Sequence, residues 1–275
     1  MDSMIKPIKH KLRPLSDRTI GSINWVGLWT LYSKEVERFL KVYQQTIAGP
    51  ALTTLLFLAV FSLALGRAVL DVGGIKYIEF LAPGLIIMTM AQNAFTNTSS
   101  SLISSKIMGN IVDLLMPPFT AHEINIAFIF GAITRAFLVG VATALLMFPF
   151  VNIMVSNVFY FIFFFVSGSI MMSLIGLISG IWAEKFDHIG AITNFAITPL
   201  TFLSGTFYSI NRLPEPFYTI SQFNPFFYMI DGFRYSMIGY ADANVYVGMI
   251  VLSSVNIFLY FISWIMLTRG WYLKP

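Results

Sequence analysis

The feature that most constrains this chain is the spacing of its charged residues. Five long stretches contain no Asp, Glu, Lys or Arg: 42–66, 80–105, 136–183, 188–211 and 243–268. A helix that crosses the hydrocarbon of a bilayer needs about 20 predominantly apolar residues. Charged residues make up only 11% of the chain, against about 25% in an ordinary soluble domain. The sequence therefore predicts an all-α integral membrane protein.

The uncharged stretches predict six transmembrane helices. The longest, 136–183, holds two crossings because Pro149, Asn152, Ser156 and Asn157 interrupt it with turn-forming residues. Each of the other four stretches holds one crossing. The predicted spans are 46–66, 80–102, 124–148, 158–182, 189–208 and 245–267.

The basic residues predict the orientation of these spans. An even number of crossings places both termini on one side, and twelve of the 17 Lys and Arg residues fall on that side, against four on the other. Cytoplasmic loops carry the excess of Lys and Arg, so both termini are predicted to be cytoplasmic. The net charge of +4 needs no nucleic-acid partner, because topology and contact with anionic membrane lipids account for it.

The segment before the first span divides into two parts. The first is basic, contains three Pro and Gly residues and shows no periodicity, which predicts a flexible cytoplasmic arm. In the second, apolar residues recur at helical spacing from Trp25 to Tyr43, and Lys34, Glu37, Arg38 and Lys41 lie on the opposite face. This pattern predicts an amphipathic helix at the membrane surface. The predicted divisions are the arm 1–21, the amphipathic helix 22–45, the transmembrane domain 46–270 and a cytoplasmic tail 271–275.

A second amphipathic pattern lies between the second and third spans. Ile107, Ile111, Leu114 and Leu115 repeat at helical spacing, and Pro117-Pro118 then stops the helix. A short amphipathic helix in this position either lies on the bilayer or docks a cytoplasmic partner.

Arg135 is the one charged residue inside a predicted span. It lies near the middle of the third span, where a charge costs at least about 2.5 kcal/mol. One alternative is that Arg135 faces the bundle interior, a subunit contact or water, as part of a pathway or a dimer contact. The other is that the span is displaced and Arg135 extends to the membrane surface. We favour the interior position.

Two other spans carry packing signals. The fourth contains Gly168, Ser173, Gly176 and Gly180, whose small side chains favour close contact between helices. The fifth contains Pro199, which predicts a kink buried within protein.

The segment 209–242 is too polar for a span and too aromatic for an ordinary loop. One hypothesis is that short re-entrant helices dip into the outer leaflet and are broken at Asn224-Pro225, since irregular backbone at membrane depth is tolerated only inside protein or beside water. The alternative is an external belt of aromatic residues at the membrane surface.

Several stretches in this order resemble ABC-2 type export permeases. Leu213–Tyr218 and Phe223–Arg234 resemble the signature that precedes the last span of this family. Three further stretches agree: Tyr43–Ile47 with Pro50, Ala82–Met88, and Thr198–Tyr208. The resemblance covers residues 22 to about 270 and is nearest to the bacterial inner-membrane branch of YadH- and NodJ-like permeases.

The resemblance implies an assembly of two permease chains, expected to be a homodimer, with ATP-binding subunits that hold ATP and Mg²⁺. It implies no catalytic residue, metal site or bound cofactor in this chain. The residues implied at the coupling helix are Ile107, Ile111, Asp113, Leu114, Leu115 and Met116. Those implied at the connecting helix are Trp29, Lys34, Glu35, Arg38 and Phe39, and those in the external re-entrant segment are Pro214, Phe217, Asn224, Pro225 and Arg234.

Two other functional classes compete with an ABC permease. A secondary transporter or channel usually carries intramembrane carboxylates and inverted repeats, and the predicted spans contain no Asp or Glu. A membrane enzyme could use His122-Glu123 or Glu184, Asp187 and His188, but neither group has the H-E-x-x-H spacing of a metalloprotease. The chain also lacks a G-x-x-x-x-G-K-[ST] phosphate loop, so a permease of this kind takes its energy from a partner.

Overall fold

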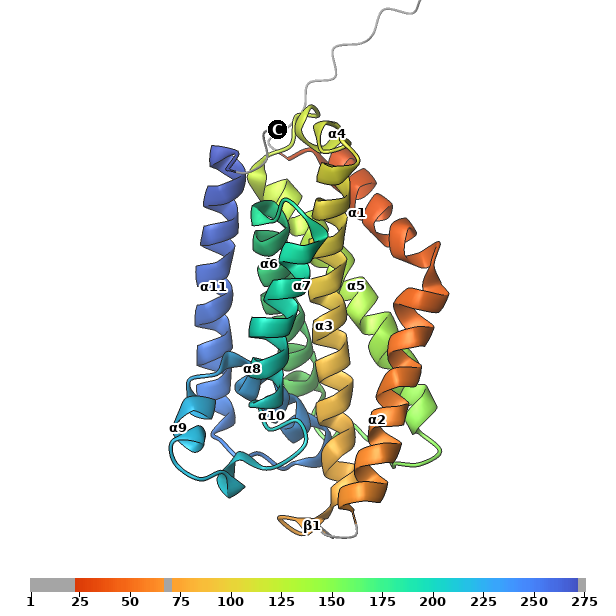
Figure 1. Cartoon of the computed structure of the whole chain (residues 1–275), viewed down its shortest axis with the longest axis vertical. Helices are drawn as coiled ribbons and strands as arrows, with labels where there is room; N and C mark the ends of the chain where they lie inside the picture. Colours follow the sequence, from red (N-terminus) through yellow and green to blue (C-terminus); the bar gives the residue numbers. More distant parts are fainter. Residues whose placement is uncertain (1–22, 67–70, 272–275) are drawn as a thin grey trace, which may run out of the picture.

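The computed structural model describes residues 23–66 and 71–271 and consists almost entirely of helices. The predicted arm 1–21 and all but one residue of the predicted tail 271–275 lie outside the described residues. Five helical stretches are long and apolar enough to cross a membrane, and they run along the long axis of the molecule (Figure 1). They are the stretch that includes α2 (Gly49–Leu65), and the helices α3 (Tyr77–Ile107), α5 (Ala121–Met147), α6 (Val158–Trp182) and α11 (Val245–Arg269).

Shorter elements lie at the two ends of this bundle. We call the end at the top of Figure 1 the α4 end and the opposite end the β1 end. Towards the α4 end are α1 (Trp25–Leu40), α4 (Val112–Leu115) and α7 (Phe186–Ile192). Towards the β1 end are α8 (Thr198–Phe202), α9 (Phe217–Gln222), α10 (Pro225–Ile238), the 3₁₀ turn η3 (Ile210–Arg212) and the antiparallel hairpin of β1 (Asp71–Val72) and β2 (Ile75–Lys76).

The observed helices follow four of the predicted spans closely. α6 covers the same residues as the fourth predicted span, α3 and α11 extend beyond their predicted limits by a few residues, and α5 begins three residues earlier and ends one residue earlier than predicted. The predicted span 189–208 corresponds to α7, the π-helical turn η2 (Thr193–Ile197) and α8, which ends before a turn at Gly205 with φ of +72°. This stretch is shorter than the five long helices, so the sixth crossing stays a prediction.

Two π-helical turns interrupt helical stretches, each shortly before a proline. The turn η1 (Gln44–Ala48) comes before Pro50, and η2 comes before Pro199. Proline has no backbone N–H, so the carbonyl four residues earlier loses its helical partner and the preceding turn widens. The break predicted near Pro199 corresponds to the π-helical turn η2, but the prediction that it is buried within protein is wrong, because Pro199 is exposed and Phe195 is 85% exposed.

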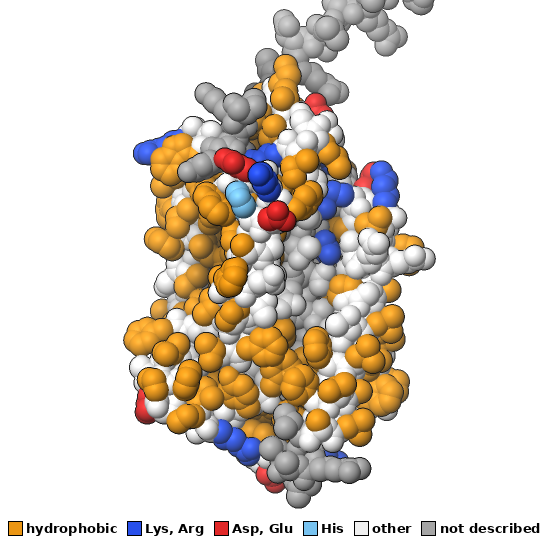
Figure 2. Space-filling model, viewed as in Figure 1, with side chains coloured by type: hydrophobic (Ala, Val, Ile, Leu, Met, Phe, Trp, Pro, Cys, Tyr) orange, Lys and Arg blue, Asp and Glu red, His pale blue; other side chains and the backbone are white. Residues whose placement is uncertain are grey.

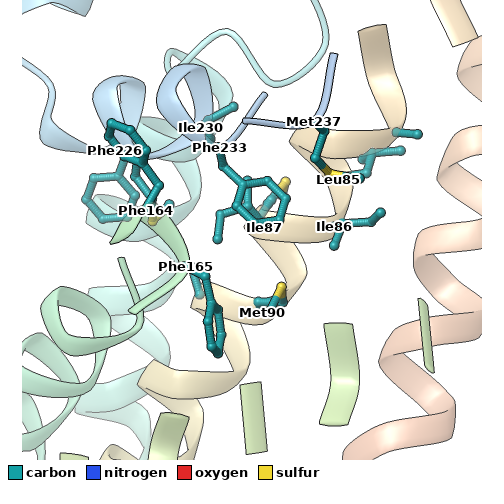
Figure 3. Close-up of a cluster of buried hydrophobic side chains, with 14 of the residues drawn as sticks. Leu85, Ile86, Ile87, Met90, Phe164, Phe165, Phe226, Ile230, Phe233 and Met237 are labelled. Carbon is teal, nitrogen blue, oxygen red and sulfur yellow. The ribbon is translucent and has the colours of Figure 1, made fainter. Parts of the chain in front are cut away.

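The apolar core lies around α3, which is the most deeply buried of the long helices. Figure 3 shows side chains from α3, α6 and α10 meeting there. Small residues of α6 allow the backbones to approach: a Cβ atom on Gly176 would lie 2.2 Å from Thr98 Oγ1 and 2.4 Å from the carbonyl oxygen of Phe95. Thr98 Oγ1 also donates to the carbonyl oxygen of Ser173 at 2.9 Å. The predicted role of the small residues in close helix contact is confirmed.

The outer surface fits a bilayer. Apolar side chains cover most of the visible face between the two ends, and most charged side chains gather near the ends (Figure 2). Helix association within a bilayer relies on close packing and hydrogen bonds, because lipid is as apolar as the helix surfaces. Polar side chains inside the bundle therefore need a specific explanation.

Candidate functional site

A row of polar residues on α3 connects three neighbouring helices. Thr89, Asn93, Asn97 and Ser101 recur every four residues, so they share one face of the helix. All four are buried. Each hydrogen-bonds to a residue of another helix, and we call this row the α3 ladder.

The half of the α3 ladder nearer the α4 end binds α1. Ser101 Oγ donates to Glu35 Oε1 at 2.6 Å, and Arg38 Nη2 donates to Asn97 Oδ1 at 3.0 Å. Arg38 also pairs with Glu35 at 3.1 Å. Glu35 is only 1% exposed, so these two partners stabilise a carboxylate that is removed from water.

The other half of the α3 ladder binds α5 and α2. Arg135 Nη2 donates to Asn93 Oδ1 at 2.9 Å, and the hydroxyls of Thr89 and Thr54 lie 2.6 Å apart. Arg135 is 5% exposed, so the structure places it inside the bundle and not at the membrane surface. By helix geometry it lies about 21 Å from the start of α5 and about 18 Å from its end.

The charges along the α3 ladder do not balance. Arg38 and Arg135 carry two positive charges, and Glu35 is the one carboxylate that bonds to the ladder among the described residues. The buried Nε atoms of both arginines also lack a hydrogen-bond partner. Unpaired donors in a low-dielectric interior are unfavourable unless water or a ligand satisfies them.

A cavity of ≈390 Å³ lies beside Arg135. Its lining comes from η1, α2, α3 and α5, and most of its residues are polar although the surrounding helices are apolar. The polar lining residues are Gln45, Thr53, Thr54, Thr89, Gln92, Asn93, Thr96 and Arg135. Ligand sites commonly combine a concave shape with a few converging polar groups.

A larger groove of ≈720 Å³ lies between α1 and α5, with mostly apolar walls that include Trp25, Trp29 and Phe130. The charged residue in its lining, Glu123, is already used: it accepts hydrogen bonds from the backbone N–H groups of Asn24 at 2.6 Å and Thr120 at 2.7 Å. Glu123 and Thr120 form a capping box at the start of α5. The groove therefore offers an apolar surface without a free charge.

One of the two groups considered for an enzyme, His122-Glu123, has structural partners. Glu123 caps α5, and His122 Nδ1 lies 2.7 Å from the hydroxyl of Tyr260. Among the described residues no three His, Cys, Asp or Glu side chains come together as a metal site would require.

A second buried arginine ties the β1 end together. Arg234 is 0% exposed and donates to the carbonyl oxygens of Phe80 at 3.2 Å and Gly205 at 2.7 Å. Its guanidinium lies 3.8 Å from the centre of the Phe80 ring and 3.8 Å from Asp231 Oδ1. Every main partner of Arg234 is thus part of the fold, and we call this group the Arg234 clamp.

Asp231 links the clamp to the segment before α11. Its carboxylate accepts the backbone N–H groups of Asp242 at 2.8 Å and Ala243 at 2.9 Å. Burial raises the pKa of Asp231 to about 6, although Arg234 and the two N–H groups favour the charged form.

The Arg234 clamp brings together three of the stretches that resemble ABC-2 type permeases: Ala82–Met88, Thr198–Tyr208 and Phe223–Arg234. A Cβ atom on Gly84, within Ala82–Met88, would lie 3.0 Å from Arg234 Nη2 and 3.0 Å from the carbonyl oxygen of Thr206. Asn224, within Phe223–Arg234, caps α10. Its Nδ2 donates to the carbonyl oxygen of Leu200, within Thr198–Tyr208, at 2.7 Å. Pro225 begins α10, whereas Phe217 and Pro214 are exposed.

The expected coupling helix is shorter than the sequence suggested. We expected one helix to carry Ile107 to Met116, but α3 continues to Ile107, Gly109 forms a turn with φ of +75°, and α4 covers only Val112–Leu115. Ile111 and Leu114 are buried against the bundle. The other four expected coupling residues are exposed: Ile107, Asp113, Leu115 and Met116. Ile111 and Leu114 therefore anchor the segment to the bundle, and the exposed four are free to contact a partner.

The connecting helix also differs from the expectation in one respect. Trp29 is 65% exposed and Lys34 is exposed, as expected for a helix that contacts the membrane surface. The helix packs onto the bundle through Leu31, Glu35 and Phe39. Arg38, which the periodicity placed on the water-facing side, instead binds α3, because Asn97 and Glu35 provide acceptors there.

The α3 ladder was not predicted from the sequence. A readable signal was present, since Thr89, Asn93, Asn97 and Ser101 recur every four residues inside an otherwise apolar run. Which helices these residues face could not be read from the spacing.

Residues 26–238 match the membrane domain of the ABC-2 type transporter family. This match covers most of the chain, which therefore belongs to the ABC-2 type transporter family. The chain is 34% identical over 246 residues to the inner membrane transport permease YadH of Escherichia coli (strain K12), covering 90% of this chain and 96% of YadH. It is 26% identical over 249 residues to nodulation protein J of Rhizobium leguminosarum bv. viciae, covering 87% and 92% of the two chains.

Proposed function

We propose that this chain is the permease subunit of an ATP-binding cassette exporter in the bacterial inner membrane. Two copies form the translocation path, and separate ATP-binding subunits, which hold ATP and Mg²⁺, drive it. Membership of the ABC-2 family and the similarity to YadH support this proposal. The lack of a phosphate-binding loop in the sequence agrees with a permease that is not itself an ATPase.

The observation that carries the proposal is the exposed apolar surface at the α4 end. Val112 is 46%, Leu115 43% and Met116 80% exposed, and Asp113 lies among them. Leu114 packs against the bundle beneath them. A rigidly anchored apolar surface of this kind suits the docking of a partner subunit that moves the transmembrane helices.

In this proposal the α4 end is cytoplasmic, because most Lys and Arg residues belong to that side. The stretch from α7 to α8 forms the sixth crossing, at about 25 Å by helix geometry. The short helices α9 and α10 form the external re-entrant segment. Both described ends of the chain then lie on the cytoplasmic side.

Exposed polar side chains support a dimer. Gln45, Thr53 and Thr96 are exposed although they belong to stretches that are predominantly apolar. Hydrogen-bonding groups that face lipid are unfavourable, so these residues are better placed against a second copy or a water-filled path.

The first test is to purify the tagged chain from its own membrane in mild detergent and identify stoichiometric partners. We expect an ATP-binding subunit that carries a Gly-Lys-Ser/Thr phosphate loop. Recovery of the chain alone in several detergents would instead favour the alternative of a secondary transporter driven by an ion gradient.

The second test is to place a charge on the free part of the coupling segment. Leu115→Glu should reduce the stimulation of partner ATPase activity by at least about tenfold, since an unpaired charge in an apolar contact costs more than about 1.4 kcal/mol. Leu114→Glu is not a suitable variant, because Leu114 is buried in the bundle. ATPase activity in proteoliposomes is the measurement.

The matched control is Leu145→Glu on α5, which places the same charge on a side chain that is 68% exposed. It should leave ATPase coupling unchanged in the protein that inserts. Equal coupling in the wild type and Leu115→Glu would show that the ATPase contact lies elsewhere.

A further inference from the structure

We propose that the cavity beside Arg135 binds the anionic group, a phosphate or carboxylate, of an amphiphile dissolved in the membrane. This inference rests on the proposed function, because it names the class of molecule that the permease would carry. It is carried by the cavity, the buried guanidinium that lines it and the missing counter-charge.

The guanidinium has donors left over for a ligand. Arg135 donates to Asn93 from Nη2, and no hydrogen bond from its Nη1 is found among the described residues, whereas its unpaired Nε is itself buried. The side chain is 5% exposed yet lines the cavity of ≈390 Å³. Arginine presents several donors in a planar arrangement that matches phosphate and carboxylate oxygens, so an anion in the cavity would complete its hydrogen bonding.

The fold itself does not neutralise Arg135. The ion pairs among the described residues are Arg38–Glu35, Lys41–Glu37 and Arg234–Asp231, and none includes Arg135. Arg38 binds Asn97, one helical turn along the α3 ladder from the Asn93 that binds Arg135, and adds a second positive charge. The carboxylate of Glu35 pairs with Arg38 and also accepts a hydrogen bond from Ser101. The positive charge beside the cavity is therefore in excess.

A second copy of this chain does not offer the missing carboxylate at this depth. The helices α2, α6 and α11 contain no Asp or Glu, and α3 and α5 carry theirs in the first turn, as Glu79 and Glu123. Arg135 is near the middle of α5. A buried charge at mid-membrane depth requires a partner or water, which makes an anionic ligand the fitting counter-charge.

The other walls of the cavity favour an amphiphile over a free ion. Phe57, Leu85 and Met88 supply apolar surface next to the polar side chains. The π-helical turn η1 and Pro50 border the cavity on the α2 side, and π-helical turns often mark functional positions in helices. A molecule with an anionic group and an apolar portion would satisfy both parts of the lining.

The experiment uses the full-length chain in detergent and measures bound lipid by native mass spectrometry. The probes are phosphatidylglycerol and diacylglycerol with identical acyl chains, of which only the first carries an anionic phosphate. We expect the wild type to retain phosphatidylglycerol at least about tenfold more strongly, because a charge-assisted hydrogen bond contributes about 1.5–3 kcal/mol. Equal retention of the two lipids by the wild type would overturn the proposal.

Three variants locate the preference. Arg135→Gln should remove it and Arg135→Lys should keep part of it. Gln92→Glu is nearly isosteric and adds a carboxylate to the cavity lining, so it should remove the preference while Arg135 is retained. The control Arg269→Gln removes an exposed arginine at the end of α11. A preference that survives Arg135→Gln and Gln92→Glu, or that disappears in Arg269→Gln, would overturn the assignment.

Competition distinguishes the source of the anion. Phosphatidylglycerol that stays bound in excess inorganic phosphate supports an amphiphile site, and displacement by phosphate would overturn that part of the proposal. This readout needs no ATP-binding partner. Failure to recover such a partner would therefore count against the exporter proposal without affecting the measured lipid preference.

Discussion

Arg135 and Arg234 are both buried, but their surroundings differ in kind. Arg234 is 0% exposed, pairs with Asp231, and donates to backbone carbonyls of two other segments. Arg135 is 5% exposed, makes one side-chain hydrogen bond, and borders a cavity. Each guanidinium keeps one buried nitrogen without a hydrogen bond, Nη1 in Arg234 and Nε in Arg135, but among the described residues only Arg234 has a carboxylate partner.

The difference shows how to separate structural from functional charges inside a membrane protein. A structural charge is paired with a counter-charge and with backbone groups that the fold fixes, so its removal disturbs the fold. A charge whose donors face a cavity adds little to the fold, and its burial is better explained by a ligand. Identical substitutions at the two arginines test this distinction.

The largest expected effect is the loss of the Arg234 clamp. Arg234→Met leaves the carbonyl oxygens of Phe80 and Gly205 without their donor and Asp231 without its counter-charge. We expect a loss of about 3–5 kcal/mol in the free energy of unfolding. The measurement is unfolding in mixed micelles with increasing sodium dodecyl sulfate. A loss below about 1 kcal/mol would contradict the structural role.

The second effect concerns Arg38, which stands between the two extremes. Its side chain is 33% exposed, but it pairs with Glu35, whose side chain is 2% exposed. Arg38→Met should lower the unfolding free energy by about 2 kcal/mol, because it leaves a buried carboxylate without its cation. Adding Glu35→Gln should recover part of the loss. If the double variant is no more stable than Arg38→Met, the pair does not account for the effect.

The sequence predicted the long helices better than the site. Uncharged runs placed α6 at its observed limits, because an uninterrupted apolar run of this length fits a membrane helix. The mid-span position of Arg135 suggested an interior charge. The motifs around Gly84, Gly205 and Arg234 were visible as a resemblance, but their meeting at one clamp could only be seen in three dimensions.

The α3 ladder and the face of α1 were harder to predict for a physical reason. Periodicity assigns charged residues to the side away from apolar ones, which placed Arg38 towards water. The structure turns Arg38 and Glu35 inward because α3 offers Asn97 and Ser101 at matching heights. Such matching depends on the distance and tilt between helices, which one sequence does not specify.

The third effect is a pH dependence that Asp231 gives to the clamp. Folding raises its pKa to about 6, so the folded chain binds a proton more tightly than the unfolded chain. The resulting stability is fully present below the unfolded pKa of about 4 and is lost as the pH rises through about 6. We expect roughly 1–2 kcal/mol between these limits.

The comparison of the wild type with Asp231→Asn isolates this effect from other titrating groups. Unfolding free energies in micelles from pH 4 to 7 should fall more steeply with rising pH in the wild type than in the variant, because Asn cannot titrate. Parallel pH profiles would assign the dependence to other residues. Arg135 has no carboxylate partner of this kind among the described residues, so we expect no comparable pH dependence of the unfolding free energy from the surroundings of Arg135.

The smallest expected effect on stability completes the comparison. Arg135→Met removes one hydrogen bond to Asn93 and a charge without a carboxylate partner. Replacing such a charge by an apolar side chain of similar length should change the unfolding free energy by less than about 1 kcal/mol, or stabilise the fold. The same micelle unfolding assay measures it beside Arg234→Met. A loss as large as that of Arg234→Met would mean that Arg135 is a structural charge, and that its cavity needs no ligand to explain it.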